Sequence, residues 1–253
     1  MKTTLRIAHC SDTHLDSNAP GSSANDALRH AFAVALADMR AHHPDMLLLP
    51  GDLFDSNAAT DDTILWAMRI LGEQPFPVVM IPGNHDCMDD RAIFHRYDFN
   101  TIPNVRMLSA PKGEIAFLPE LGVAVWGKGM VEHNRAYQPL AGCPARPENC
   151  RWYFGMGHGL FVPHGGDTDR SSPIHMREIE ASPCDYLALG HHHAAMELVT
   201  DHSAAAYSGS CTDTIGRGHS YIIVDLGQSN VARVKVHTVG TEHSAQVRAH
   251  AAD

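Results

Sequence analysis

Carboxylate, amide and imidazole side chains gather in five short clusters along this chain, and each cluster follows an apolar run. The clusters are Asp12-Thr13-His14, Gly51-Asp52-Leu53-Phe54-Asp55, Gly83-Asn84-His85-Asp86, Gly157-His158-Gly159 and Gly190-His191-His192-His193. Oxygen and imidazole ligands together suit manganese, iron(II) or zinc, and no cysteine belongs to any cluster. Any one cluster is weak evidence, because Asp, Asn, Gly and His also form ordinary turns. All five together indicate a pocket of metal ligands.

Three consecutive histidines follow a short apolar run at residues 186–189, which is bounded by Gly190. This pattern predicts a buried strand. Residues two apart in extended chain face the same way, so His191 and His193 can point into one cavity while His192 points elsewhere. The pair therefore needs partners from other parts of the chain.

Alternating strand and helix patterns must position these clusters. Apolar runs predict strands at residues 5–8, 46–49, 78–81, 123–126, 153–156 and 186–189. Helical spacing of apolar residues predicts helices over residues 25–42 and 63–71, the second behind Asp61 and Asp62, which favour a helix start. Strand, helix, strand, helix, strand predicts a sheet with crossover connections. Sites in such sheets form beyond the carboxyl ends of the strands.

Shorter alternating segments complete the pattern. Hairpins are predicted at residues 105–108, 114–118 and 123–126, and antiparallel strands at 196–199, 204–208, 220–226 and 231–239. Residues 131–152 hold three prolines and two cysteines, which predicts a helix and then an irregular loop that can border a site. We predict a layered α/β sandwich of two mixed sheets with helices outside. It forms one domain over residues 1–240, followed by a loose tail at 241–253.

The composition limits the functional classes. The chain has 29 Asp+Glu against 19 Lys+Arg and a formal net charge of −10, so it lacks the basic excess of proteins that hold long duplex DNA. Its 19 histidines raise the expectation of a metal site. No apolar run approaches the roughly 20 residues that a membrane helix needs. We expect a cytoplasmic protein with no membrane partner.

Six cysteines are scattered along the chain without a CxxC pair. This spacing signals neither a disulfide framework nor a structural zinc site. We expect reduced thiols, with a bridge between Cys143 and Cys150 as the alternative.

The ordered set DxH, GDxxD, GNHD, GH and GHxH resembles the motifs of the calcineurin-like metallophosphoesterase superfamily, and it extends from Asp12 to His193. The resemblance implies two divalent metals between two β-sheets, in a four-layer α/β/β/α sandwich. One metal would be held by Asp12, His14, Asp52 and His193. The other would be held by Asp52, Asn84, His158 and His191, with Asp52 bridging. Manganese is the favoured metal, and iron or zinc are the alternatives.

The resemblance also implies a reaction. Two cations roughly 3.5–4 Å apart would neutralise a phosphodiester and steady the attacking and leaving oxygens of an in-line displacement. His85, beside Asn84, corresponds to the family's catalytic histidine, which would donate a proton to the leaving oxygen or stabilise transition-state charge. Asp86 and Asp55 are candidates for orienting that histidine or a ligand imidazole. The alternative for both is a turn carboxylate that caps local amides.

Within the superfamily, "HCSDTHLD", "LLLPGDLFDS", "VVMIPGNHD", "CDYLALGHHH" and "AAYSGS" are similar to the nuclease subunit of the bacterial SbcCD repair complex. Those subunits continue into a capping domain and a helical segment that docks on an ATPase, whereas this chain ends about 40 residues after Ser210. We therefore predict the hydrolytic core without an SbcC-type ATPase partner.

Three functions stay open on the sequence. The first is a phosphodiesterase of nuclease ancestry that acts on nucleic acid ends, short oligonucleotides or another diester. The second is a small-molecule phosphodiesterase or phosphomonoesterase, with cyclic nucleotides as one example. The third is a non-catalytic scaffold, which is disfavoured because every motif residue is present. The natural substrate, endo- or exo-cleavage and the oligomeric state are left open.

Overall fold

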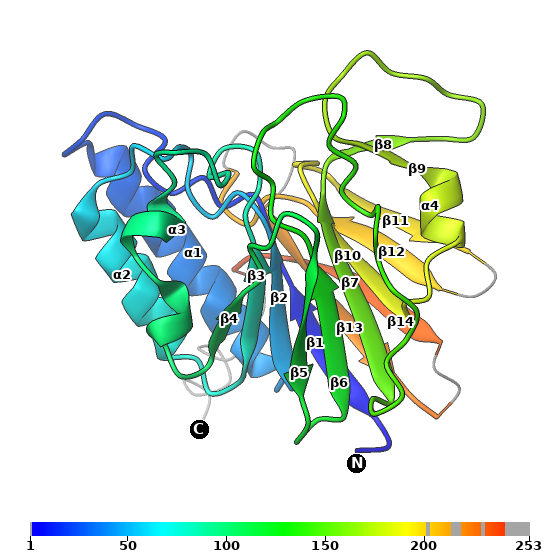
Figure 1. Ribbon diagram of the computed structural model, residues 1–253. Coiled ribbons are helices and arrows are strands. Elements are labelled where there is room, and N and C mark those ends of the chain that lie inside the picture. The colour runs from blue at the N-terminus through cyan, green and yellow to red at the C-terminus, as the bar shows by residue number, and fades with distance from the viewer. Residues whose placement is uncertain (1, 201–202, 214–218, 229–230, 241–253) are drawn as a thin grey trace, which may run out of the picture.

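The computed structural model describes residues 2–200, 203–213, 219–228 and 231–240, in which two six-stranded sheets lie face to face (Figure 1). The first sheet has the order β14-β13-β1-β2-β3-β4 and the second β11-β12-β10-β7-β6-β5. The strands of the first sheet are β1 (Leu5–His9), β2 (Met46–Pro50), β3 (Val78–Ile81), β4 (Val105–Met107), β13 (Ser220–Leu226) and β14 (Ala232–Thr238). Those of the second are β5 (Glu114–Leu118), β6 (Val123–Gly127), β7 (Trp152–His158), β10 (Tyr186–Gly190), β11 (Ala195–Val199) and β12 (Ala204–Ser208). A separate parallel pair is formed by β8 (Leu160–Val162) and β9 (Pro173–His175).

Helices cover the outer faces of both sheets. The first sheet is covered by α1 (Ser23–Ala41) and α2 (Asp61–Gly72), with the short α3 (Ile93–Arg96) and η1 (Phe99–Thr101) beside them (Figure 1). Ser22 caps α1 and Thr60 caps α2, each through a side-chain oxygen that accepts a backbone N–H in the first turn. The second sheet is covered by α4 (Met176–Glu180) and by residues 128–151.

Strand side chains alternate between the layer that joins the sheets and the layers outside them. On β7, Trp152 and Phe154 pack between the sheets, whereas Tyr153 packs outward under residues 128–151. Leu5 and Ile7 on β1 face the second sheet in the same way. Because both faces of β7 are buried, its sequence is an almost continuous run of apolar residues and glycine.

Strand direction explains where the motif clusters meet. β1, β2, β3 and β4 run parallel in the first sheet, and β6, β7, β10 and β12 run parallel in the second. Parallel strands in one sheet end at the same edge, so the loops that follow them gather there. These edges of the two sheets touch, because a Cβ placed on Gly190 would lie 2.0 Å from the carbonyl oxygen of Pro50.

The predicted sandwich of two mixed sheets with outer helices is confirmed. The hairpin prediction is correct for β5 and β6 but wrong for β4, which pairs parallel to β3 in the first sheet. The helix expected within residues 131–152 is also wrong, because this segment forms turns. Its three prolines lack the N–H that a helix needs, and the Asn134 side chain accepts from the N–H groups of Ala136 and Tyr137. Of the remaining elements, β8, β9, α3, η1 and α4 were not predicted.

Other expectations reach beyond the fold. The loose tail predicted at residues 241–253 lies outside the described residues, and the single domain over residues 1–240 stays a prediction. Among the described residues, no helix has the length and hydropathy to cross a bilayer. The cytoplasmic location stays a prediction.

Candidate metal centre

The predicted ligands come together at the shared edge of the two sheets. Three overlapping sets of candidate ligand atoms lie at this edge, and the atoms of each set lie within 4.8 Å of one another: Asp12 with His14 and His193, His14 with Asp52 and His85, and Asp52 with His158 and His191. Asn84 joins the last of these sets through its side-chain oxygen. The five sequence clusters thus meet in one place, although they extend over most of the chain.

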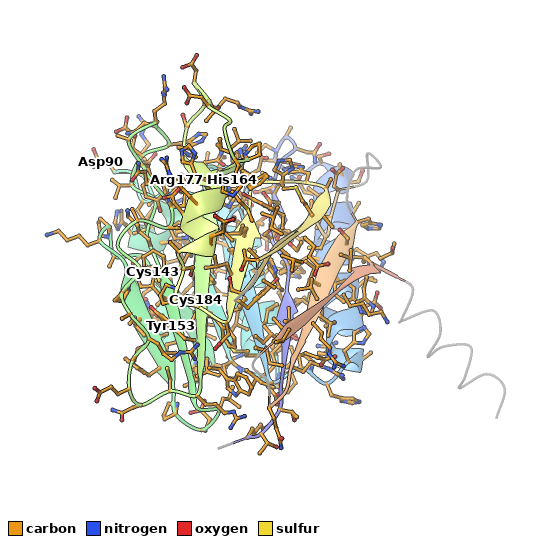
Figure 2. The ribbon with its side chains drawn as sticks, turned by 90° about the vertical axis from the view of Figure 1, so that its right-hand side faces the viewer. Asp90, Cys143, Tyr153, His164, Arg177 and Cys184 are labelled. Carbon is orange, nitrogen blue, oxygen red and sulfur yellow. The ribbon has the colours of Figure 1, made fainter. Side chains whose placement is uncertain are left out.

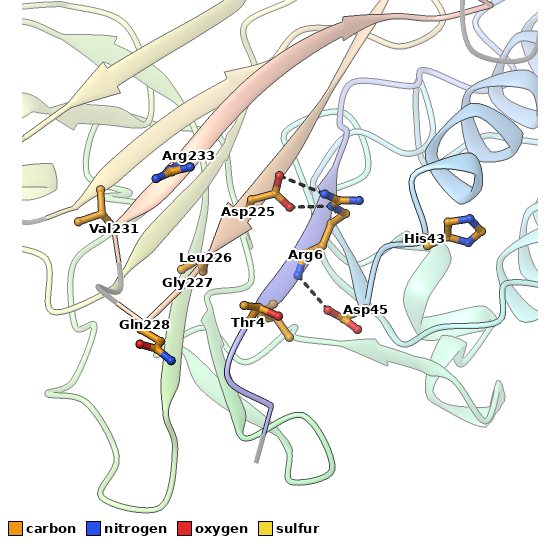
Figure 3. Close-up of a pocket in the computed structure, with 11 residues that line it drawn as sticks. Thr4, Arg6, His43, Asp45, Asp225, Leu226, Gly227, Gln228, Val231 and Arg233 are labelled. Atoms are coloured by element: carbon orange, nitrogen blue, oxygen red, sulfur yellow. Dashed lines mark hydrogen bonds and ion pairs between the residues drawn. The ribbon is translucent and has the colours of Figure 1, made fainter. Parts of the chain in front are cut away.

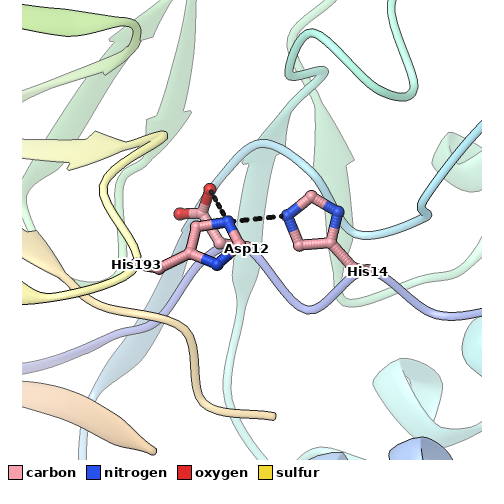
Figure 4. Close-up of side chains that lie close together, drawn as sticks. All are labelled: Asp12, His14 and His193. Carbon is pink, nitrogen blue, oxygen red and sulfur yellow. Dashed lines mark hydrogen bonds and ion pairs between the residues drawn. The ribbon is translucent and has the colours of Figure 1, made fainter. Parts of the chain in front are cut away.

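The first ligand group is formed by Asp12, His14 and His193 (Figure 4). The Nε2 atoms of the two imidazoles face each other at 3.1 Å, and Asp12 Oδ1 lies 3.9 Å from His193 Nε2 (Figure 4). Asp52 Oδ2 lies 3.7 Å from His14 Nε2. Two carboxylates and two imidazoles around one point are a donor set that suits manganese, iron(II) or zinc.

The second ligand group is formed by Asp52, Asn84, His158 and His191. Asn84 Oδ1 lies 3.0 Å from His158 Nε2 and 2.9 Å from His191 Nδ1. His158 Nε2 lies 3.2 Å from Asp52 Oδ2, the same oxygen that borders the first group. One carboxylate oxygen therefore stands between two sets of ligand atoms, which is the arrangement a bridging aspartate requires.

Hydrogen bonds on the far side of each ring orient two of the imidazoles. His158 Nδ1 lies 2.8 Å from the carbonyl oxygen of Pro50, so this nitrogen carries the proton that it donates. His14 Nδ1 lies 3.2 Å from Asp55 Oδ1 and donates in the same way. Such partners fix the tautomer and leave Nε2 as the ligand nitrogen.

Strained backbone accompanies the cluster. Asp12, His14, Asp52 and His191 have left-handed φ angles of 54°, 47°, 53° and 101°. A non-glycine residue in this region costs about 1–3 kcal/mol and persists where the surrounding structure holds it. The His191 N–H donates to the Asp12 carboxylate at 3.0 Å, and the His14 N–H donates to the Asp52 carbonyl at 3.1 Å. The strain is thus held by the same residues that form the ligand groups.

Motif glycines allow the strand ends to approach one another. A Cβ on Gly83 would lie 2.1 Å from Asp52 Oδ1, and one on Gly190 would lie 2.7 Å from His158 Nδ1. A side chain at either position would displace a predicted ligand. These glycines are therefore part of the site, although they carry no ligand atom.

We expect Gly83→Ala to lower the affinity for both metals by at least about tenfold, because its Cβ would displace the shared carboxylate of Asp52. The matched control is Gly227→Ala, since no atom lies within 4 Å of a Cβ built there. Calorimetric titration with Mn²⁺, together with the far-ultraviolet CD spectrum of each variant, measures the effect. Equal affinity in the two variants would show that the close packing is not required.

Burial and charge shift the pKa values of the ligand groups. Burial raises the pKa of Asp52, but His158 and His14 lower it by more. Burial lowers the pKa of His158, but Asp52 outweighs this effect and sets it at about 9. Burial and the charge of His158 lower the pKa of His191 to about 3. In the metal-free protein at neutral pH, His158 is therefore protonated and His191 is neutral.

Metal binding at pH 8 should release about one proton from His158, because a metal ligand must be deprotonated and the pKa of this imidazole is about 9. The affinity for the metal should rise about tenfold for each pH unit below the pKa of His158 and should level off above this pKa. Calorimetric titration in buffers of different ionisation enthalpy measures the number of protons released, because the observed binding enthalpy changes with the buffer in proportion to that number. His158→Gln, which leaves the first ligand group in place, should lack this release. An unchanged proton count in that variant would contradict the assignment.

His85 lies beside the ligand groups with its side chain partly exposed. Its backbone N–H donates to Asp52 Oδ1 at 2.9 Å, and its Nδ1 lies 2.7 Å from the carbonyl oxygen of Asp55. The ring packs edge-on against His14 at 4.6 Å between centroids. Donation from Nδ1 leaves Nε2 as the nitrogen available to a substrate.

Asp86 and Asp55 lie in different surroundings. The Asp86 carboxylate is buried and accepts from the N–H groups of Gly83, Leu53 and Phe54 at 2.7, 2.9 and 3.2 Å. Burial and the charge of Asp52 raise the pKa of Asp86 to about 7, and the amides offset this only in part. The carboxylate found beside His85 is that of Asp55, with Oδ1 3.8 Å from Nδ1. Asp86 thus connects its own loop at residues 83–86 to the loop at residues 52–55, and Asp55 contacts the imidazoles of His14 and His85.

Three residues near the metal centre were not predicted from the sequence to belong to the site: Ser210, Thr212 and His133. Ser210 Oγ donates to the carbonyl of Asp12 at 2.6 Å, and Thr212 Oγ1 donates to that of Thr13 at 2.6 Å, so Ser210 and Thr212 hold the first motif loop. His133 lies with its ring centroid 6.0 Å from that of His191. The only signal for His133 was its place in a proline-rich segment expected to border a site.

A cavity lies at the other end of the first sheet, by the amino end of β1 (Figure 3). Its volume is about 630 Å³. Arg6 Nε is paired with Asp225 Oδ1 at 2.6 Å, and the Arg6 N–H donates to Asp45 at 2.9 Å (Figure 3). Two charged side chains of this cavity, Arg6 and Asp225, are thus paired with each other, in contrast to the converging ligand atoms at the carboxyl ends of the strands.

Two mixed sheets thus bring carboxylate, amide and imidazole ligand atoms to one edge, which is the arrangement of a candidate metal centre. Residues 5–195 match the family described as Calcineurin-like phosphoesterase, and the chain belongs to this family. The predicted superfamily and the predicted enzyme class are confirmed, and the family implies divalent metal ions.

Similar proteins agree with this assignment. The uncharacterized metallophosphoesterase YhaO of Bacillus subtilis (strain 168) is 25% identical over 272 residues, which is 97% of this chain and 64% of that protein. The chain thus spans less than two thirds of that relative. A probable cyclic nucleotide phosphodiesterase of Pseudoalteromonas sp. (strain SM9913) is 33% identical over 85 residues, 34% of this chain and 33% of its own length. The crystal structure of TT1561 of Thermus thermophilus shares the fold, with a TM-score of 0.59, 14% identity, and coverage of 94% of this chain and 100% of that one.

Proposed function

We propose that this protein hydrolyses phosphodiester bonds with a pair of divalent metals, manganese being favoured over iron and zinc. Asp12, His14, Asp52 and His193 would hold one metal, and Asp52, Asn84, His158 and His191 the other. The observation that carries the proposal is the position of Asp52 Oδ2, 3.2 Å from His158 Nε2 and 3.7 Å from His14 Nε2. When bound, two such cations offset the charge of the phosphate and make water a better nucleophile at neutral pH.

The chain's own residues would position the reacting groups. The His85 N–H donates to the shared carboxylate, so the main chain at His85 is fixed relative to both ligand groups. The carbonyl of Asp55 accepts from His85 Nδ1 and sets the ring angle. His85 Nε2 would then hold the proton that the leaving oxygen takes up. Asp86 would act indirectly, since its carboxylate binds the loops that carry Asp52 and Asn84.

A diester substrate of modest size fits the charge of the chain. The net charge of −10 gives little grip on the phosphates of a long duplex. We therefore propose nucleic acid ends or short oligonucleotides as substrates, in line with the resemblance to the SbcCD nuclease subunit, and leave an SbcC-type ATPase partner out of the proposal. Cyclic nucleotides are the second candidate, which the relative from Pseudoalteromonas supports.

A substrate panel tests the proposal. Protein loaded with Mn²⁺, Fe²⁺, Zn²⁺ or Mg²⁺ is given bis-(p-nitrophenyl) phosphate and p-nitrophenyl phosphate, and we expect turnover of the diester to exceed that of the monoester. Single-stranded DNA and 3′,5′-cyclic nucleotides then separate the two candidates. A preference for the monoester would overturn the diesterase proposal, and turnover of cyclic nucleotides without DNA cleavage would favour the second candidate.

A further inference from the structure

Two cysteines lie side by side on the outer face of the second sheet, away from the metal centre. Cys143 Sγ is 3.9 Å from Cys184 Sγ and 3.5 Å from Tyr153 Oη (Figure 2). Cys143 belongs to the segment 128–151, and Cys184 comes two residues before β10. The two sulfurs are brought together from positions 41 residues apart in the chain.

The two thiols differ in access. Cys184 is only 3% exposed, whereas Cys143 is partly exposed and lines a cavity of about 200 Å³ together with Leu140, Glu178 and Leu187. A small solute in this cavity reaches Cys143 first. Cys184 lies behind it and within reach of its sulfur. This is the arrangement of an accessible thiol with a buried resolving thiol.

Neighbouring donors favour the ionised form of Cys143. The Cys184 thiol and the Tyr153 hydroxyl can each donate a hydrogen bond to its sulfur. The bond from Cys184 lowers the pKa of Cys143, burial opposes this, and Tyr153 adds to the lowering. A lower thiol pKa increases the fraction of thiolate, which is the nucleophile in oxidation.

We propose that Cys143 and Cys184 form a redox modification site, in which a peroxide oxidises Cys143 and Cys184 resolves the product as a disulfide. The Cys143 thiolate attacks one peroxide oxygen, the O–O bond breaks, and a sulfenic acid and hydroxide result. The Cys184 sulfur then attacks Cys143, the S–S bond forms, the S–O bond breaks, and hydroxide leaves with the Cys184 proton as water. The sulfur pair loses two electrons and the peroxide gains them.

The bond would tie the segment 128–151 to the second sheet. This segment already packs on β7, since a Cβ on Gly157 would lie 2.9 Å from Leu140 Cδ2. β7 ends at His158, and the same segment carries His133 near His191. The modification site therefore lies on an element that borders the metal centre, although it requires no activity of that centre.

Peptide mapping of the whole protein tests this proposal. The reduced protein is treated with hydrogen peroxide, alkylated, digested without reductant and analysed by mass spectrometry. We expect wild type to lose two thiols and to yield a linked Cys143–Cys184 peptide. Cys150→Ser is the matched control in the same segment and should behave as wild type. When dimedone is added to trap sulfenic acid, Cys184→Ser should instead give a dimedone adduct on Cys143. Cys143→Ser should form no disulfide at Cys184.

The linked peptide is sought in the wild-type protein, so the test does not depend on whether a variant folds. A linked Cys143–Cys150 peptide would overturn the proposal. So would a Cys143 thiol that stays reduced in peroxide concentrations that oxidise other cysteines of the chain. The measurement is independent of the metal centre, because metal-free protein gives the same expected linkage.

Discussion

Replacing His85 with alanine should lower phosphodiester turnover by about two or more orders of magnitude while both metals stay bound. The side chain supplies the imidazole that would protonate the leaving oxygen, whereas the contact to Asp52 comes from the backbone N–H and survives the substitution. The ligand groups should therefore keep their geometry. Elemental analysis of the purified variant measures the metals, and steady-state kinetics with bis-(p-nitrophenyl) phosphate measures kcat.

The matched control for this prediction is His164→Ala. His164 is an exposed histidine that pairs with Glu180, so it shares the residue type but not the surroundings. Its kcat should equal that of wild type. If His85→Ala also turns over at the wild-type rate, His85 has no part in proton transfer. A loss of metal in His85→Ala would instead make it a residue of the ligand groups.

The second large effect is expected for Asp52→Asn, which should release both metals together. The substitution removes the negative charge from a side chain that borders both ligand groups. Loss of a shared ligand should exceed the roughly 10–100-fold affinity loss that is typical of an outer-shell partner. His193 belongs to the first ligand group alone, so His193→Ala should leave one metal per chain.

Metal content per chain decides this prediction. The control is Asp225→Asn, an aspartate that pairs with Arg6 at the far end of the first sheet and should keep two metals. Two metals bound to Asp52→Asn would contradict the shared position of this carboxylate. Sequential loss of the metals, one well before the other, would assign Asp52 to a single group.

Local patterns in the chain were enough to find most of the fold. β3, β5, β12 and β13 have the bounds predicted from apolar runs and alternation, and α1 and α2 differ from their predictions by two residues or fewer at each end. These features depend on backbone preference and on burial of neighbouring side chains, which a short stretch of sequence expresses. The nine site residues followed from the motif resemblance, and the structure brings them to one edge of the sandwich.

Pairings between distant segments could not be predicted in this way. β4 has the same kind of short alternating pattern as β5, yet it joins the first sheet because it pairs with β3, the strand before it, rather than with β5, the strand after it. Asp55 and Asp86 were equal candidates by sequence, and only the fold buries Asp86 among backbone amides and places Asp55 beside His85. No local pattern expresses such a choice, because it depends on which loops pack together.

By itself, the sequence determined the family, the residue types of the candidate metal ligands and the positions of most of the strands, since each depends on residue type and short-range spacing. The tertiary structure decided that Asp52 Oδ2 stands between two ligand groups and that Cys184, rather than Cys150, lies beside Cys143. Both results join residues that are dozens of positions apart. They depend on the packing of one sheet against the other and of residues 128–151 against β7, which the spacing of residues along the chain does not encode.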